Sequence, residues 1–148
     1  FGALPMWNPR RFTLNLILYS FGIWLVTGIL QVLFDVGAPQ LASSVVPGMF
    51  AAMQEAQRYA IATGHRPEKA SIWHSSRMMA EIHLTLIVRL SVIAATLSPE
   101  VRYMFAHVNI VALIVVFGLF TGLSLVFMRW GYSLGIKLGL EEREKNTG

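Results

Sequence analysis

FTLNLILYSFGIWLVTGILQVLF, residues 12–34, and YMFAHVNIVALIVVFGLFTGLSLVFM, residues 103–128, decide the fold of this chain. The first run has 23 residues and the second has 26, and neither carries a formal charge. About 20 apolar residues span the hydrocarbon core of a bilayer as an α-helix. Both runs are long enough to cross, so they predict an integral membrane protein.

The composition supports this class of protein. Of the 148 residues, 55% are hydrophobic and only 14% are charged, whereas a soluble globular domain has about 25% charged residues. We therefore expect a single transmembrane domain over residues 1–148. The net charge of +4 comes from short basic clusters beside apolar runs, which is typical of membrane topology signals and argues against nucleic acid as a partner. The chain has no cysteine, which excludes disulfides, thiolate metal sites and cysteine nucleophiles.

Hydropathy and helix-breaking residues predict an all-α, four-helix transmembrane bundle. Gly64 ends the second helix, Arg66–Pro67 marks a break in the loop that follows, and Ser98 and Pro99 separate the last two helices. The expected spans are residues 13–34, 41–63, 76–97 and 101–130, followed by a cytoplasmic tail over 131–148.

The second expected span has the least apolar sequence. Pro47 predicts a kink or interruption, and Glu55 and Arg58 lie in its second half. An alternative is an amphipathic helix in the membrane interface, with both charged side chains among the headgroups. The charge distribution favours a full crossing, because otherwise the basic loop over residues 66–77 would lie outside.

Basic residues gather on one side when the N-terminus is placed in the cytoplasm. Four crossings leave Arg102 outside and Arg89 within a span, and all other Lys and Arg residues become cytoplasmic. The cytoplasmic residues are Arg10, Arg11, Arg58, Arg66, Lys69, Arg77, Arg129, Lys137, Arg143 and Lys145. We therefore predict a multi-pass protein with both termini in the cytoplasm.

Charged side chains inside spans are costly and are candidates for function. Glu55 has Arg58 at i+3 and Glu81 has Arg77 at i−4, so each carboxylate has a cation on its own helix face. One hypothesis is a small polar site near the cytoplasmic leaflet that carries a proton or a cation. The hypothesis that we favour is two ion pairs that satisfy buried charge and hold the second and third helices together.

Arg89 has no carboxylate at i±3 or i±4, although it lies about 12 residues, or 18 Å, into the third span. We favour a structural role for it, with a neighbouring subunit, a lipid phosphate or Glu55 as its partner. The alternative is a side chain that extends towards the membrane surface.

Two histidines, His83 and His107, lie near spans and are weak candidates for ligands of haem or chlorophyll magnesium. No two histidines stand at i, i+3 or i+4, so no helix face predicts a metal site. A histidine that hydrogen-bonds between helices is the favoured interpretation. We expect no cofactor, but we do expect bound lipid.

Glycines at fourfold spacing predict close helix packing in the last span and its tail. Gly118 and Gly122 lie in the span, and the same spacing recurs at Gly131, Gly135 and Gly139. Because glycine weakens a helix by about 1 kcal/mol relative to alanine, these positions suggest a backbone that a neighbour approaches closely.

The middle of the chain resembles an uncharacterised family of small proteobacterial inner-membrane proteins with about four spans. The resemblance rests on FAAMQEAQRYAIATGHRP, residues 50–67, followed by Trp73. Ser71 stands where the family tends to have an acid, and Glu55 where a small residue is usual. The resemblance implies the bacterial inner membrane and four helices, but no activity.

The expected function is that of a non-catalytic accessory subunit that packs against a larger membrane protein complex. No P-loop, dinucleotide fingerprint, HExxH or nucleophile elbow is present, so an enzyme is not predicted. The first alternative is a small homo-oligomeric transporter or channel, and the second is a cofactor-binding subunit that uses His83 or His107. The expected partners are membrane lipids and other membrane protein subunits.

Overall fold

The computed structural model describes residues 6–35 and 40–148, which form five α-helices and no strand. The all-α prediction is therefore confirmed. The helices are α1 (Pro9–Phe34), α2 (Gln40–Thr63), α3 (Lys69–Leu97), α4 (Pro99–His107) and α5 (Ile110–Thr147). Among these described residues, α1, α3 and α5 are long and apolar enough to cross a membrane. This supports a membrane protein, with three candidate spans in place of the four expected from the sequence.

Polar residues at the helix ends explain where the helices begin and stop. The Asn8 side chain accepts hydrogen bonds from the backbone N–H groups of Arg10 and Arg11, and Pro9 follows as the first helical residue. Asn109 accepts from the Val111 N–H at 2.9 Å and starts α5. At the end of α2, Gly64 adopts a left-handed φ of 72°, which glycine reaches without steric cost.

Two expected helix boundaries are corrected. A single helix over 101–130 is not formed, because Asn109 caps a new helix and separates α4 from α5. The third helix begins at Lys69, seven residues earlier than expected. The sequence predicts a kink or an interruption at Pro47; the helix runs continuously through Pro47 to Thr63, so the interruption is not formed.

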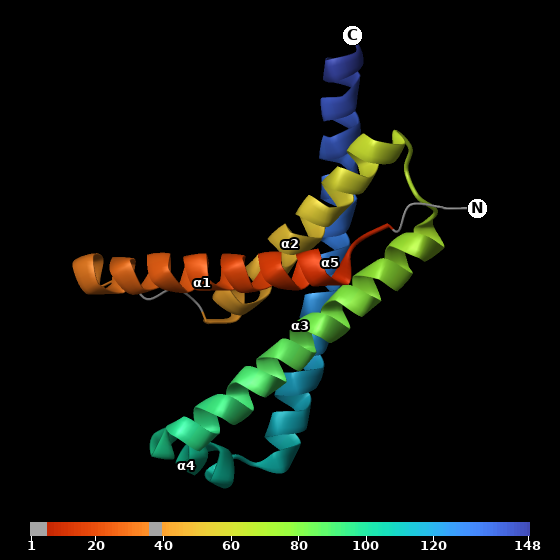
Figure 1. The fold of residues 1–148 in the computed structure, drawn as a ribbon. Helices are drawn as coiled ribbons and strands as arrows, with labels where there is room; N and C mark the ends of the chain where they lie inside the picture. The colour runs from red at the N-terminus through yellow and green to blue at the C-terminus, as the bar shows by residue number, and fades with distance from the viewer. Residues whose placement is uncertain (1–5, 36–39) are drawn as a thin grey trace.

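Helix α5 is much longer than a membrane is thick. Its 38 residues extend about 57 Å, whereas the hydrocarbon core of a bilayer is about 30 Å thick. The second half of α5 therefore continues beyond its most apolar part, and α2 packs along this second half (Figure 1). The stretch expected as a tail is thus a helix with a packing partner.

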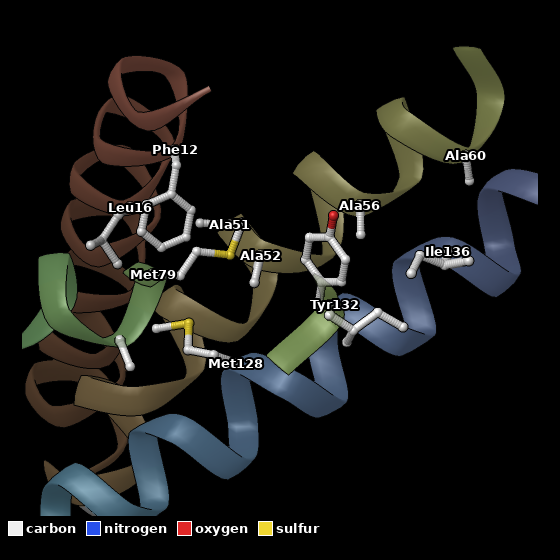
Figure 2. Packing of buried hydrophobic residues seen from close by; sticks show 12 residues of the cluster. Phe12, Leu16, Ala51, Ala52, Ala56, Ala60, Met79, Met128, Tyr132 and Ile136 are labelled. Atoms are coloured by element: carbon white, nitrogen blue, oxygen red, sulfur yellow. The ribbon is translucent and has the colours of Figure 1, made fainter. Parts of the chain in front are cut away.

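The buried core lies where four helices meet. The N-terminal end of α1 crosses α2, and the first half of α3 crosses the middle of α5 (Figure 1). Figure 2 shows the side chains that pack there. We call this region the junction; its buried apolar residues include Phe12, Ala52, Met79, Met128 and Tyr132.

Away from the junction, the apolar helices have few neighbours. Within the most apolar 18-residue windows, only 6% of α1, 17% of α3 and 6% of α5 is buried inside the molecule. Figure 1 shows α1 running across α2 and α5 instead of beside them. The expected compact four-helix bundle is therefore replaced by an open arrangement in which most apolar faces point outward.

Candidate functional site

Glu55 is the most buried charged side chain among the described residues of the junction, with 0% of its side chain exposed. Its Oε1 accepts from Arg11 Nε at 2.5 Å, and its Oε2 accepts from Arg11 Nη2 at 2.8 Å. The backbone N–H of Asn8 donates to Oε2 at 3.1 Å. This bidentate pair fixes the start of α1 to the middle of α2.

The sequence-predicted cation, Arg58, also reaches Glu55, at 3.6 Å from Oε1. Arg11 and Asn8 were missed as partners because they lie more than 40 residues away in the chain. From the sequence, Arg11 is only a topology signal beside the first span. Both carboxylate oxygens are engaged by donors, so Glu55 fits a structural clamp better than a site that binds and releases a proton or cation.

Glu81 and Arg77 do form an ion pair, at 3.1 Å, but the pair is at the surface. Their side chains are 60% and 76% exposed. In the described part of the chain, no hydrogen bond or ion pair joins Glu81 to Glu55. The expectation of two buried pairs holding the second and third helices together is therefore corrected. Of the two carboxylates, only that of Glu55 is buried among the described residues, and its pair with Arg11 connects α1 to α2.

Arg89 is exposed on the second half of α3, and it makes no hydrogen bond or ion pair with any other described residue. The expectation of a buried cation is corrected. The physical reason is the path of α1, which crosses at the junction and leaves the second half of α3 without a covering helix.

His83 is buried at the junction end of α3 and connects this helix to α2. Its Nε2 lies 2.8 Å from the Ser44 carbonyl oxygen. Since a carbonyl oxygen only accepts, Nε2 carries the proton, and in the neutral ring Nδ1 is an acceptor. Nδ1 is buried and has no hydrogen-bond partner among the described residues. The ring centre lies 5.9 Å from that of Phe120.

His107 is exposed on α4, where its ring lies 3.9 Å from that of Tyr103. Neither histidine has the surroundings of a metal ligand set, because the described residues contain no group of three or more His, Cys, Asp or Glu that is placed to hold a metal ion. A histidine hydrogen-bonded between helices is what His83 presents.

The three glycines in the second half of α5 lie directly against the backbone of α2. A Cβ added to any of them would collide with a carbonyl oxygen of α2. The pairs are Gly131 with Met49, Gly135 with Met53, and Gly139 with Gln57. Each four-residue step along α5 matches a four-residue step along α2, so the helices run parallel. A glycine hydrogen takes the place of each missing Cβ and points at the carbonyl, which is a recurring contact between closely packed helices.

Polar contacts continue this parallel interface to the end of α2. Gln57 Nε2 donates to Glu142 at 2.8 Å, and Arg143 donates to the Ile61 carbonyl at 3.1 Å. The arginine thereby satisfies one of the last carbonyls of α2, which have no partner within the helix.

Gly118 and Gly122 have a different environment, because a Cβ added to either would meet nothing within 4 Å. Thirteen residues separate Gly118 from Gly131. At about 100° per residue, the two glycine pairs face directions roughly 140° apart around α5. The glycines are therefore two surfaces: one holds α2, and the other is open.

Comparisons with known protein families, with curated proteins and with solved structures found no match for this chain.

Proposed function

We propose that this chain is a non-catalytic accessory subunit of the bacterial inner membrane that packs against a larger membrane protein complex. The observation that carries the proposal is the open glycine pair Gly118–Gly122. On the same helix, the same spacing at Gly131 and Gly135 brings a neighbouring backbone into direct contact. A transmembrane helix of the partner would use the open pair in the same way.

The difference between the open glycines and the other outward residues of α5 matters, because exposed apolar surface alone does not attract a protein partner within a bilayer. Lipid tails are as apolar as leucine, so helices associate in membranes through close packing and hydrogen bonds. Small residues at fourfold spacing permit that close packing, whereas most other outward residues of α5 are large, such as Val115, Leu119 and Val126. The open glycines therefore mark the part of α5 best suited to another helix.

The path of the chain supports four crossings, with both termini in the cytoplasm. α1 and α3 both begin at the junction and lead away from it, and α5 returns to it (Figure 1). If α1 and α3 both cross the membrane, the chain must cross back between them. α2 is the helix in that interval, and it runs parallel to α5, towards the junction side.

α2 is less apolar than a typical span because it contains polar residues, and these residues have partners within the protein. Glu55 binds Arg11, and Gln54 accepts a hydrogen bond from the Tyr19 hydroxyl at 3.2 Å. Polar groups paired within the protein are tolerated at membrane depth. With the junction at the cytoplasmic face, these pairs lie at the cytoplasmic end of the crossing that we propose for α2, and the residues of α2 before them make the crossing.

Aromatic and basic side chains suggest that the junction lies at the cytoplasmic face of the membrane. The Arg129 guanidinium lies 4.0 Å from the ring centre of Trp73, and Trp130 is 58% exposed beside it. The rings of Trp7 and Phe12 pack edge to face, with 5.7 Å between their centres. Tryptophan is enriched at membrane–water interfaces and basic residues on the cytoplasmic side, which matches this placement.

The two alternative functions have weaker support. A transporter that uses Glu55 would have to release a carboxylate engaged by Arg11, Arg58 and Asn8. A cofactor-binding subunit that used His83 would need an accessible imidazole, whereas Nε2 of His83 is engaged by Ser44 and Nδ1 is buried. His107, the other candidate, is exposed, and its Nδ1 lies 2.9 Å from the Tyr103 carbonyl oxygen of its own helix.

The test is co-purification from the native membrane in a mild detergent, with Gly118 and Gly122 both replaced by leucine. The bulky side chains should abolish recovery of the partner while membrane insertion is retained. The matched control is Gly22→Leu with Gly28→Leu on α1, because these glycines also have open space around them. The control protein should keep its partner.

Two results would count against the accessory role. In one, wild-type protein is recovered as a monomer without any associated membrane protein. In the other, the Gly118→Leu, Gly122→Leu protein retains every partner of the wild type, which would mean that the open glycines are not the contact surface.

A further inference from the structure

Arg89 is a charged residue of a helix that is long and apolar enough to cross the membrane, and it lies on the face turned away from the rest of the chain. The residues two positions before and after it, Ile87 and Ser91, line the cleft between α1, α3 and α5. Two positions correspond to about 200° around a helix, so Arg89 lies on the opposite face of α3. Thr85 and Ile93, one turn to either side of Arg89, are exposed as well.

The position of Arg89 is close to the middle of the span that α3 would form. It stands eight residues after Glu81 and eight before Leu97, the last residue of the helix, so it lies about 12 Å from each. In the topology proposed above, the exposed pair of Glu81 with Arg77 marks the cytoplasmic end, and Leu97 marks the outer end. The hydrocarbon core is about 30 Å thick, so Arg89 is near its centre.

An extension of the Arg89 side chain to the membrane surface is disfavoured by its depth and its direction. Side chains of an α-helix are tilted toward its N-terminus, which for α3 is the cytoplasmic end. An extension to the outer surface would oppose that tilt. On the cytoplasmic side, Glu81 is about 12 Å away along the axis and already pairs with Arg77. Lipid phosphates are confined to the two surfaces, so the same depth keeps them from Arg89.

The acidic residues of this chain do not lie at the depth of Arg89. There are eight, all in the described part of the chain. Asp35 and Glu100 lie at the outer ends of helices in the proposed topology, and the others lie at or beyond the junction on the cytoplasmic side. A second copy of the chain would insert in the same orientation, so a symmetric contact would place its own Arg89 at this depth. The two cations would repel each other, which leaves a different protein as the source of a carboxylate.

We propose that the face of α3 formed by Thr85, Arg89 and Ile93 binds a transmembrane helix of a different protein, and that this helix carries an aspartate or glutamate that pairs with Arg89. The inference rests on the accessory role proposed above and names the chemistry of the partner. Charged residues within spans pair with one another and face the interior of a helix assembly. The planar guanidinium binds a carboxylate in a bidentate manner, and such a polar contact selects a neighbour where lipid tails do not.

The experiment begins with photo-crosslinking in native membranes. A benzophenone amino acid is introduced at position 85 in one protein and at position 93 in another, one turn to either side of Arg89. We expect both to crosslink to the same membrane helix of a different protein, and the crosslinked peptide to carry an Asp or Glu within its apolar stretch. Replacement of that acid by its amide should lower co-purification at least about tenfold, as expected when one member of a buried charge pair is removed.

Variants of Arg89 test the pairing from the side of this chain. Arg89→Leu should lower recovery of the partner by the same factor, and its combination with the amide variant should cause no further loss, because both changes remove one interaction. Since Arg89 contacts no other described residue, Arg89→Leu should leave the SDS unfolding midpoint of the isolated protein unchanged. The matched control combines Arg89→Leu with Leu90→Arg, which keeps the composition and moves the cation about 100° around the helix. It should also lose the partner.

Five results would overturn this inference. They are crosslinks to lipid alone, crosslinks to a second copy of this chain, a crosslinked helix without an acid, full recovery of the partner with Arg89→Leu, and full recovery with the displaced arginine.

The glycine variants keep this inference separate from the accessory role. Loss of the partner in the Gly118→Leu, Gly122→Leu protein, together with its retention in the Arg89→Leu protein, would overturn the pairing and leave the accessory role standing. The reverse pattern would support the pairing at α3 and count against the open glycines as the contact surface.

Discussion

Replacement of Gly135 by alanine should destabilise the protein, although alanine is the better helix former. The added Cβ would overlap the Met53 carbonyl oxygen and would stand 2.8 Å from its carbonyl carbon. These are backbone atoms, which cannot move aside as a side-chain tip can. Overpacking costs about 1–3 kcal/mol, and a backbone contact belongs at the upper end of that range.

The gain in helix propensity from glycine to alanine offsets about 1 kcal/mol of this cost. The net expectation is a loss of about 2 kcal/mol, which lowers the folded-to-unfolded ratio by roughly thirtyfold. Gly118→Ala is the matched control, because it makes the same chemical change on the same helix with nothing within 4 Å. That variant should be stabilised by up to about 1 kcal/mol.

The assay is unfolding of the detergent-purified proteins by increasing SDS, followed by intrinsic tryptophan fluorescence. Trp73 and Trp130 lie near the junction and report its loss. The decisive result is the opposite sign of the two variants. If Gly135→Ala is as stable as the wild type, or loses no more than Gly118→Ala, then α5 does not lie against the α2 backbone as described.

Further predictions concern the clamp, the surface pair, the topology and the end of α2. Glu55→Gln should lower the free energy of unfolding by about 1.5–3 kcal/mol, because charged hydrogen bonds to Arg11 and Asn8 are weakened. Glu81→Gln should change it by less than about 0.5 kcal/mol, since the pair of Glu81 with Arg77 is exposed. SDS unfolding measures both variants, and equal losses of stability would contradict a buried Glu55 and an exposed Glu81. In this cysteine-free chain, cysteines introduced at Ala70 and Asn146 should react with an impermeant thiol reagent only from the cytoplasmic side. A cysteine introduced at Glu100 should react only from outside. Labelling of position 70 from outside would rule out the four-crossing topology. Arg143→Ala should cost about 1 kcal/mol and increase hydrogen exchange at the last turn of α2, because the Ile61 carbonyl loses its donor; unchanged exchange there would contradict that role.

Local features of the site could be predicted from sequence because they depend on residues a few positions apart. The ion pair of Arg77 with Glu81 lies on one helix at i+4, and Arg58 approaches Glu55 at i+3. Burial could not be predicted in the same way. Glu55 is enclosed and Glu81 is exposed because α1 crosses at one carboxylate and not at the other.

The break between α4 and α5 shows a limit of hydropathy as a guide. Residues 103–128 carry no formal charge, and they were therefore expected to form one helix. The Asn109 side chain competes with the helix by accepting the Val111 N–H, and it starts a new helix at Ile110. Asparagine is a known capping residue, so this boundary was present in the sequence but was outweighed by the apolar run.

The sequence by itself determined that the chain is all-helical and apolar enough to lie in a membrane, because helix formation and hydropathy are properties of short, contiguous segments. It also indicated which residues permit close approach, through the fourfold glycine spacing. Only the tertiary structure decided that Gly131, Gly135 and Gly139 hold α2 while Gly118 and Gly122 stay open. It likewise decided that Arg11 clamps Glu55. The physical reason is that lipid offers apolar helices no preference among neighbours, so steric fit and a few polar contacts between distant segments select the partners.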